Sequence, residues 1–404
     1  MVLFLFGGAT LFAAGERTAQ PTVTNAVLRY WMAFALMENP PVEKALPDLL
    51  DQVAAGNVPW SEEKFRVILD LNQNAIEIMQ RASKLPECTW GLDLELGPST
   101  PIAHLARGRA LSRLNLLYGL RLQSRGELGR AVESWLCGVR FAEHLSHEGS
   151  LVSGLVSISA LSANFRTIAK AVSMQEVDQR FLVEIERELS KLSPYGINWV
   201  EVWGNEAKGL DLWLGRLAEK NAEEACIDMV QTFERSMDPC TEVSRKKIAE
   251  RLGLLPSELS NTEKFRNVFQ KTREEHRQLM REIIAAYAFP YLGAATRLNG
   301  LELRAKEVRS INPLLNFLLP SIERANEIRA EAEAQRALLL ALVNIRQRPI
   351  KKLRSIDSLG GFKLPLDPFS GKPPQITASE QWVEVRSVGK DASGSPIMYR
   401  LRVE

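Results

Sequence analysis

The stretch TPIAHLARGRALSRLNLLYGLRLQSRGELGRAVESWLCGVRFAEHLSH, residues 100–147, decides the fold. Its apolar residues recur every three or four positions, as on one face of an α-helix. The polar triplet 125–127 interrupts this spacing, and its central Gly126 suits a tight turn. We therefore predict a hairpin of two helices, over about 100–124 and about 128–147.

The same helical spacing continues on both sides of this hairpin, from about Thr24 to Ile345. Beyond Pro349, glycine and proline punctuate the chain, and alternating residues at 382–385 and 397–401 indicate short strands. We expect a mainly α protein, an irregular helical-hairpin array or bundle with a small C-terminal β/turn segment. Its expected units are a signal peptide or N-terminal anchor (1–20), an N-terminal helical array (21–235), a second helical unit (236–348) and an extended C-terminal segment (349–404).

Turn-forming residues divide the helical part into elements. Ser61 is a predicted N-cap, followed by two glutamates in the favourable first turn of a helix that runs to about Lys84. Later helices are expected over about 262–298 and 313–346. The charged stretch 235–281 is a candidate hinge between the helical halves.

The hairpin resembles one tetratricopeptide-type repeat. The resemblance covers about 35 residues and does not recur at that period, so it implies an irregular helical stack rather than a regular repeat domain. The residues that carry it are Leu117, Tyr118, Gly119, Gly126, Ala131, Trp135 and Gly138.

The N-terminus points to export. Residues Val2 to Ala14 are almost wholly apolar and are followed by Glu16 and Arg17, as in the apolar region of a signal peptide. A basic segment before this region is missing, so an uncleaved anchor and a buried N-terminal helix remain alternatives. The expected location is extracytoplasmic, in the periplasm or cell envelope, with membrane contact only through this segment if it is retained.

The charge and cysteine content narrow the classes of function. The 51 basic and 49 acidic residues give a net charge of +2, which is unlike a nucleic-acid-binding protein. Basic residues from Arg346 to Arg354 are interpreted as a solvated junction after a long helix. The four cysteines allow three disulfide pairings, but a helix between Cys226 and Cys240 would hold them too far apart to bond. Without a close cysteine pair, a structural zinc site is not expected.

The segment from Leu364 to Pro373, together with residues 385–391, resembles the C-terminal part of uncharacterised exported helical proteins of planctomycete- and acidobacteria-like bacteria. It is also similar to the tail of type II secretion pseudopilins, which implies calcium near the final loop, at Asp391. The acidic and glycine-rich neighbours typical of that loop are reduced here, which favours a plain turn. Asp367, Pro368 and Gly371 are expected to form a structural turn that folds this segment back onto the helical stack.

Three tryptophans form a stripe on a helix that begins near Asn198. Trp199, Trp203 and Trp213 are interpreted first as core residues, because such side chains bury a large apolar area. As a binding surface they would combine with Glu206. The pairs Glu201–Glu206 and Glu206–Asp211 could line a cleft beside them.

The histidines give no catalytic signature. His144 and His147 lie three residues apart and are interpreted as a surface or helix-end pair, and His276 lies in a charged helix expected to face water. No nucleophile motif, phosphate-binding loop or dinucleotide fingerprint is present. No catalytic residue, metal or cofactor is therefore assigned.

The sequence favours a noncatalytic extracytoplasmic scaffold or protein-binding module whose partner is a protein and not a nucleic acid. One alternative is an envelope enzyme, hydrolase-like, with its site near the helix of Trp199 to Trp213. The other is a component of a secretion or pilus-like apparatus.

Overall fold

The structure, a computed structural model, describes residues 24–38, 46–54, 56–174, 177–234, 237–239, 241–348, 364–391 and 393–402. The expected signal peptide or anchor lies outside the described residues. The helices are α1 (Val27–Leu36), α2 (Leu46–Ala54), α3 (Glu62–Leu71), α4 (Gln73–Ala82), α5 (Ala103–Ser124), α6 (Leu128–Ser146), α7 (Leu151–Met174), α8 (Gln179–Lys191), α9 (Trp199–Glu219), α10 (Ala222–Phe233), α11 (Glu242–Leu252), α12 (Thr262–Tyr287), α13 (Tyr291–Ile311), α14 (Pro313–Leu318) and α15 (Ile322–Arg346). Short 3₁₀ helices span Leu94–Ser99, Pro194–Gly196 and Pro256–Glu258, and the strands are β1 (Gln375–Ala378), β2 (Trp382–Lys390) and β3 (Pro396–Arg402). The fold is mainly helical with a small C-terminal antiparallel sheet, which confirms the predicted class.

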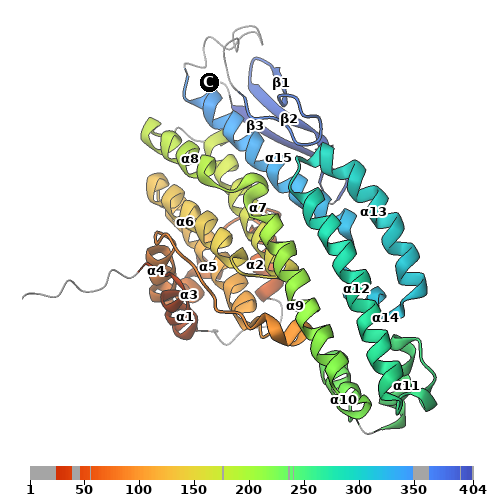
Figure 1. Cartoon of the computed structure of the whole chain (residues 1–404). Helices are drawn as coiled ribbons and strands as arrows, with labels where there is room; N and C mark the ends of the chain where they lie inside the picture. Colours follow the sequence, from red (N-terminus) through yellow and green to blue (C-terminus); the bar gives the residue numbers. More distant parts are fainter. Residues whose placement is uncertain are drawn as a thin grey trace, which may run out of the picture.

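The predicted hairpin is present as α5 and α6, which pack side by side (Figure 1). Gly126 turns the chain between them with φ of +79°. The helices approach closely at Gly119, where a Cβ atom would lie 2.2 Å from Nε1 of Trp135. That indole nitrogen instead donates a hydrogen bond of 3.2 Å to the carbonyl of Leu116. A small residue opposite a large one therefore sets the spacing of this hairpin.

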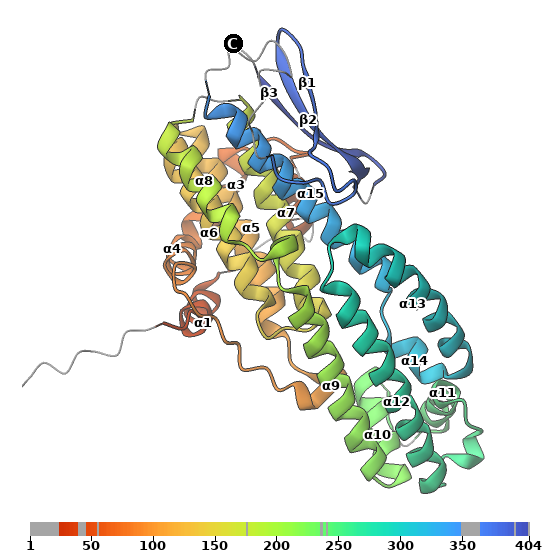
Figure 2. The same ribbon diagram turned by 45° about the horizontal axis from the view of Figure 1, so that its top comes forward.

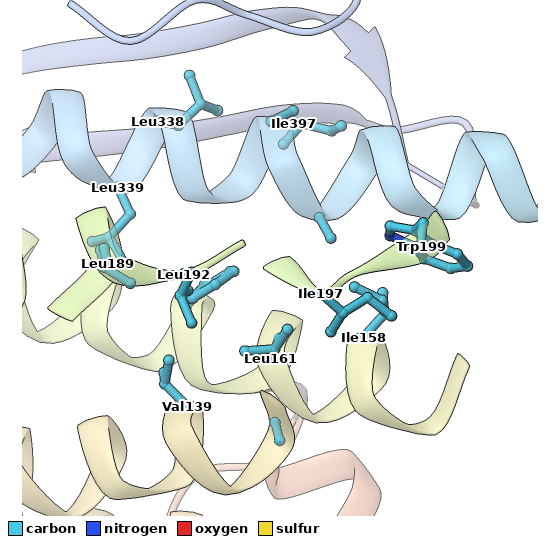
Figure 3. Packing of buried hydrophobic residues seen from close by; sticks show 14 of the residues in the cluster. Val139, Ile158, Leu161, Leu189, Leu192, Ile197, Trp199, Leu338, Leu339 and Ile397 are labelled. Carbon is cyan, nitrogen blue, oxygen red and sulfur yellow. The ribbon is translucent and has the colours of Figure 1, made fainter. Parts of the chain in front are cut away.

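The main core lies in successive layers. Helix α7 packs between α6 and α15, and the C-terminal sheet covers α15 (Figures 1 and 2). Figure 3 follows these layers from Val139 on α6, through Leu161 on α7 and Leu192 after α8, to Leu338 on α15 and Ile397 on β3. Within the described part of the chain, α7 alone is long and apolar enough to cross a membrane by length and composition, and 56% of its most apolar window is buried in this core.

Two further cores flank the main one. Helices α1 to α4 pack on α5 and α6 in an N-terminal core. The outer halves of α9 and α12 extend from the body as an antiparallel pair, with α10, α11 and α14 around their far end (Figure 2). This distal core combines described residues from both expected helical units, within 210–230 and 248–318.

The helix expected from Ser61 to Lys84 is divided at Asn72. Ser61 caps α3 as predicted, its Oγ accepting from the Lys64 amide at 3.4 Å. The buried Asn72 side chain accepts from the Glu38 amide at 3.0 Å and donates to the carbonyls of Glu38 and Ile68 at 2.9 Å each. The chain bends here because a side chain satisfies backbone groups at the junction of two elements.

Prolines also divide the two long C-terminal helices that the sequence predicts. The predicted helix 262–298 is two helices, α12 and α13, because Pro290 precedes Tyr291 and cannot continue α12. The predicted helix 313–346 is likewise divided into α14 and α15 around Pro320.

The C-terminal sheet has the order β1-β2-β3, and both pairs are antiparallel. Its inward positions alternate with outward ones, and Val383, Val385, Ile397 and Leu401 are buried against α15 and α7. The predicted turn between β2 and β3 is present, with Gly394 at φ of +80° and the Asp391 carboxylate accepting from the amides of Ser393 and Ser395. The segment therefore covers part of the helical core with a small sheet.

Candidate functional site

The tryptophans of α9 are buried in two different cores. Trp199 and Trp203 belong to the main core, with ring centroids 6.0 and 5.2 Å from that of Tyr287 (Figure 3 for Trp199). Trp213 belongs to the distal core and meets Phe233 edge to face at 5.8 Å. Because all three are buried, they do not form an exposed aromatic surface.

Glu206 is separated from the other acids that the sequence places near it. It accepts a hydrogen bond of 3.0 Å from the amide of Leu151, at the first turn of α7. The pKa of Glu206 is raised, because the effect of burial exceeds the opposite effect of this hydrogen bond. Glu201 accepts instead from the amide of Glu148 at 3.1 Å. Asp211 binds Arg273 and Arg277, whose hydrogen bonds lower its pKa to about 2 against the effect of its burial. The acids on this helix thus hold separate structural contacts.

A cavity of about 250 Å³ lies beside Glu206, between the 3₁₀ helix Leu94–Ser99 and α9. Its walls are mostly apolar, and Glu206 is the one carboxylate among its described lining residues. These described residues include no histidine. This cavity offers a single acid that is already bonded to a helix terminus.

A larger open groove of about 740 Å³ lies at the N-terminal end of α9. Four segments meet there: the connection from α8 to α9, the turn between α12 and α13, one face of α15, and the C-terminal turn at 365–371. We call it the aromatic groove. Its apolar lining consists of Tyr195, Ile197, Trp199, Val200, Tyr287, Phe289, Pro290, Leu292, Pro365, Leu366 and Pro368.

The rim of the aromatic groove exposes apolar side chains to solvent. Leu366 is 58% exposed and Leu292 47%, and Phe289 and Val200 are also exposed. Large apolar side chains gathered at a concave surface are typical of a binding site rather than of an ordinary exposed surface.

A buried arginine holds the groove walls together. The Arg329 guanidinium lies between the rings of Tyr195 and Tyr287, 4.4 and 4.5 Å from their centroids. It donates to the carbonyls of Tyr287 and Phe289 at 3.0 Å each. Tyr195 has a left-handed φ of +64°, and its hydroxyl accepts from the amide of Tyr291 at 2.7 Å. These contacts join the α8–α9 connection to the α12–α13 turn and to α15.

The charged side chains in the groove are paired within the protein. Glu333 and Arg336 form a two-pronged ion pair with both contacts at 2.8 Å, and Arg336 also donates to the carbonyl of Leu189. The buried Asp367 carboxylate accepts from the Ser387 hydroxyl at 2.8 Å and the Val388 amide at 2.9 Å. No histidine is among the described lining residues. The groove therefore presents apolar surface without a free acid or base.

The residues Asp367, Pro368 and Gly371 form a turn at the edge of this groove. The Asp367 amide donates to the Lys372 carbonyl at 2.8 Å, and the Gly371 amide donates to the Asp367 carbonyl at 2.8 Å. Gly371 has φ of +66°, a conformation that favours glycine. The Asp367 side chain reaches across to β2, so the turn positions Leu366 at the rim.

The expected surface position of the histidines is wrong for His144 and His276. His144 is buried, and its Nδ1 lies 2.7 Å from the Tyr30 hydroxyl. His276 is buried on α12, and neither ring nitrogen has a hydrogen-bond partner among the described residues. Burial lowers the pKa of His144 to about 3 and that of His276 to about 4. The helical spacing did not reveal this because the covering residues come from distant elements.

His144 borders a third, more polar cavity of about 360 Å³ between α6, α8 and the loop after α4. Burial raises the pKa of the neighbouring Glu143, and Arg140 pairs with Glu188 at 2.7 Å. Cys137, which lies close by, is buried, and burial raises the pKa of its thiol. A neutral imidazole with so low a pKa is a weak base at neutral pH, and the nearby thiol is not activated.

The described residues offer no evident metal site. No group of three His, Cys, Asp or Glu side chains among them is arranged to hold an ion. Cys88, Cys137 and Cys226 are buried and free, and Cys240 lies outside the described residues.

Sequence reasoning missed most of the aromatic groove. Pro290 and the turn around Asp367 carry a local signal, because proline and glycine mark chain reversals. Arg329 and Leu292 look like ordinary residues of amphipathic helices, and only their packing against distant segments distinguishes them. No known family model, curated protein or solved structure matches the chain, so the geometry of the aromatic groove is the basis for interpreting its function.

Proposed function

We propose that the chain is a noncatalytic extracytoplasmic binding module that takes an uncharged, apolar segment of a partner protein into the aromatic groove. The observation that carries this proposal is the combination of exposed apolar side chains at the groove rim with charged groups that are all paired internally. An apolar segment gains free energy by covering such a rim. A charged ligand would have to compete with the Glu333–Arg336 pair.

The open form of the groove favours a polypeptide over a small enclosed ligand. Small-molecule sites usually surround most of the ligand surface, whereas this groove has an exposed rim on which a longer chain can continue. The envelope-enzyme alternative has no comparable support, since the described lining residues of neither cavity beside α9 combine a carboxylate with a histidine. The apparatus alternative rests on the resemblance of the C-terminal segment alone.

Selection from a peptide display library with the purified full chain tests this proposal. We expect the selected peptides to be rich in aromatic and aliphatic residues. Leu292→Asp and Leu366→Asp should each weaken their binding at least about tenfold, because a carboxylate would be placed in the apolar contact. Leu303→Asp is the matched control, because Leu303 lies on α13, as does Leu292, is 65% exposed and does not line the groove.

Two results would overturn the proposal. One is peptide binding that the groove variants leave unchanged. The other is catalytic turnover of a hydrolase substrate, if Leu292→Asp and Leu366→Asp abolish this turnover and Leu303→Asp leaves it unchanged.

A further inference from the structure

Helix α1 carries large apolar side chains on both its buried and its exposed face. Tyr30 and Phe34 lie on its buried face, in the N-terminal core. The opposite face, which we call the α1 face, exposes Leu28 (72%), Trp31 (43%), Met32 (56%) and Leu36 (47%). Exposed apolar side chains gathered on one helix face mark a surface that contacts a partner or a membrane.

The surroundings of the α1 face extend its apolar character. Leu71, 40% exposed, precedes Asn72, whose side chain bonds the backbone of Glu38 just beyond the end of α1. The helix contains no carboxylate, and Arg29 is its one charged residue.

The position of α1 in the molecule suits a peripheral contact. It lies at an edge of the helical body, away from the C-terminal sheet (Figures 1 and 2). The chain that leads into it, residues 1–23, lies outside the described residues, and Val2 to Ala14 in that stretch carry no charged side chain. The α1 face thus follows closely on a sequence segment that is itself suited to an apolar medium.

We propose that the α1 face lies on the surface of a phospholipid membrane. Leu28 and Met32 would enter the boundary between headgroups and acyl chains, and Trp31 would lie at headgroup level, where its amphipathic ring is favoured. Arg29 is the one charged residue of the helix, and Glu87 and Glu38 lie by its two ends, so we expect apolar contact to dominate the attachment. The preceding apolar segment supplies the second anchoring element that stable attachment of a single short helix requires.

A second copy of the chain is a poorer occupant of this face. A helix of 10 residues spans about 15 Å. Four side chains on such a helix fall well short of the roughly 800 Å² that each partner buries in a stable interface. A lipid surface needs no complementary shape, so a small apolar patch can insert into it.

Sedimentation of the full chain with vesicles of phosphatidylcholine and phosphatidylglycerol tests the proposal. The double variant Leu28→Gln/Met32→Gln should partition into vesicles at least about tenfold less, because two apolar contacts are lost. Leu303→Gln/Ile311→Gln, which changes two equally exposed residues on α13, should partition as the unchanged chain does. Circular dichroism melting curves show whether each variant is folded.

A second measurement reports on the face itself. Vesicles with brominated acyl chains should quench a part of the tryptophan fluorescence that disappears in Trp31→Phe. Equal partitioning of both double variants, together with no quenching assigned to Trp31, would overturn the proposal by showing attachment through residues 1–23 alone. Self-association in light scattering that Leu28→Gln/Met32→Gln abolishes, with no quenching of Trp31, would overturn it in favour of a second copy.

Discussion

At the scale of single residues, Asp367 shows how one buried carboxylate can hold a chain reversal. It accepts hydrogen bonds from a hydroxyl and an amide of β2, and from the Phe369 amide at 3.2 Å within its own turn. Donors from two segments thus converge on one side chain. The turn and the strand are held together by charge-assisted hydrogen bonds, which are stronger than neutral ones.

Asp367→Ala is expected to lower the free energy of unfolding by about 2–3 kcal/mol, because buried donors would lose their acceptor. Denaturant unfolding followed by circular dichroism measures the change. Asp391→Ala is the control, since Asp391 accepts similar bonds in a more accessible loop, and it should cost about 1 kcal/mol or less. Equal losses in the two variants would contradict the role given to burial.

At the scale of elements, Asn72 illustrates how a junction is made between helices. Its amide group bonds the backbone of Glu38 beyond α1 and of Ile68 in the last turn of α3, so one side chain joins these two segments. The periodicity on both sides of Asn72 is nevertheless compatible with one continuous helix. A break of this kind depends on a partner 34 positions away, which local patterns do not contain.

Asn72→Ala should destabilise the chain by about 2 kcal/mol, since the three hydrogen bonds of a fully buried side chain are lost. Asn57→Ala, which removes an exposed hydrogen bond to Gln52, should change the stability by less than about 0.5 kcal/mol. Urea denaturation midpoints distinguish the two. Similar midpoints for both variants would show that the junction does not depend on Asn72.

At the scale of the whole molecule, buried neutral histidines make the stability depend on pH. Burial lowers the pKa of His104 and His276 to about 4 and that of His144 to about 3. The unfolded chain, in which these groups titrate near 6.5, therefore binds protons more readily than the folded chain between about pH 4 and 6.5. Their contribution to stability is complete above pH 6.5 and is lost as the pH falls through this window.

Each histidine contributes a slope of up to about 1.4 kcal/mol per pH unit there. His276→Leu should reduce the slope of unfolding free energy against pH by about this amount, since it replaces an unpartnered imidazole with an apolar side chain. Urea unfolding at a series of pH values from 4.5 to 7 gives the slope for both proteins. An unchanged slope would contradict the assigned burial of His276.

The distal core should also unfold locally more readily than the main core. Helices α6 and α7 have packed neighbours on both sides, whereas α10 and α11 lie at the far end of the distal core. We expect amide hydrogens of α10 and α11 to exchange faster than those of α6 and α7, as a unit, in hydrogen–deuterium exchange mass spectrometry. Uniform protection across these helices would contradict a separate distal unit.

The sequence by itself determined the helical class, the α5–α6 hairpin, the cap at Ser61, the start of α9 near Asn198, and the turn between β2 and β3. These features depend on periodicity and on turn residues, which are local properties of the chain. Only the tertiary structure decided the burial of His144 and His276, the break at Asn72 and the aromatic groove. Each of these arises where faces of distant segments meet, and the identity of the covering segment is not encoded in any local pattern.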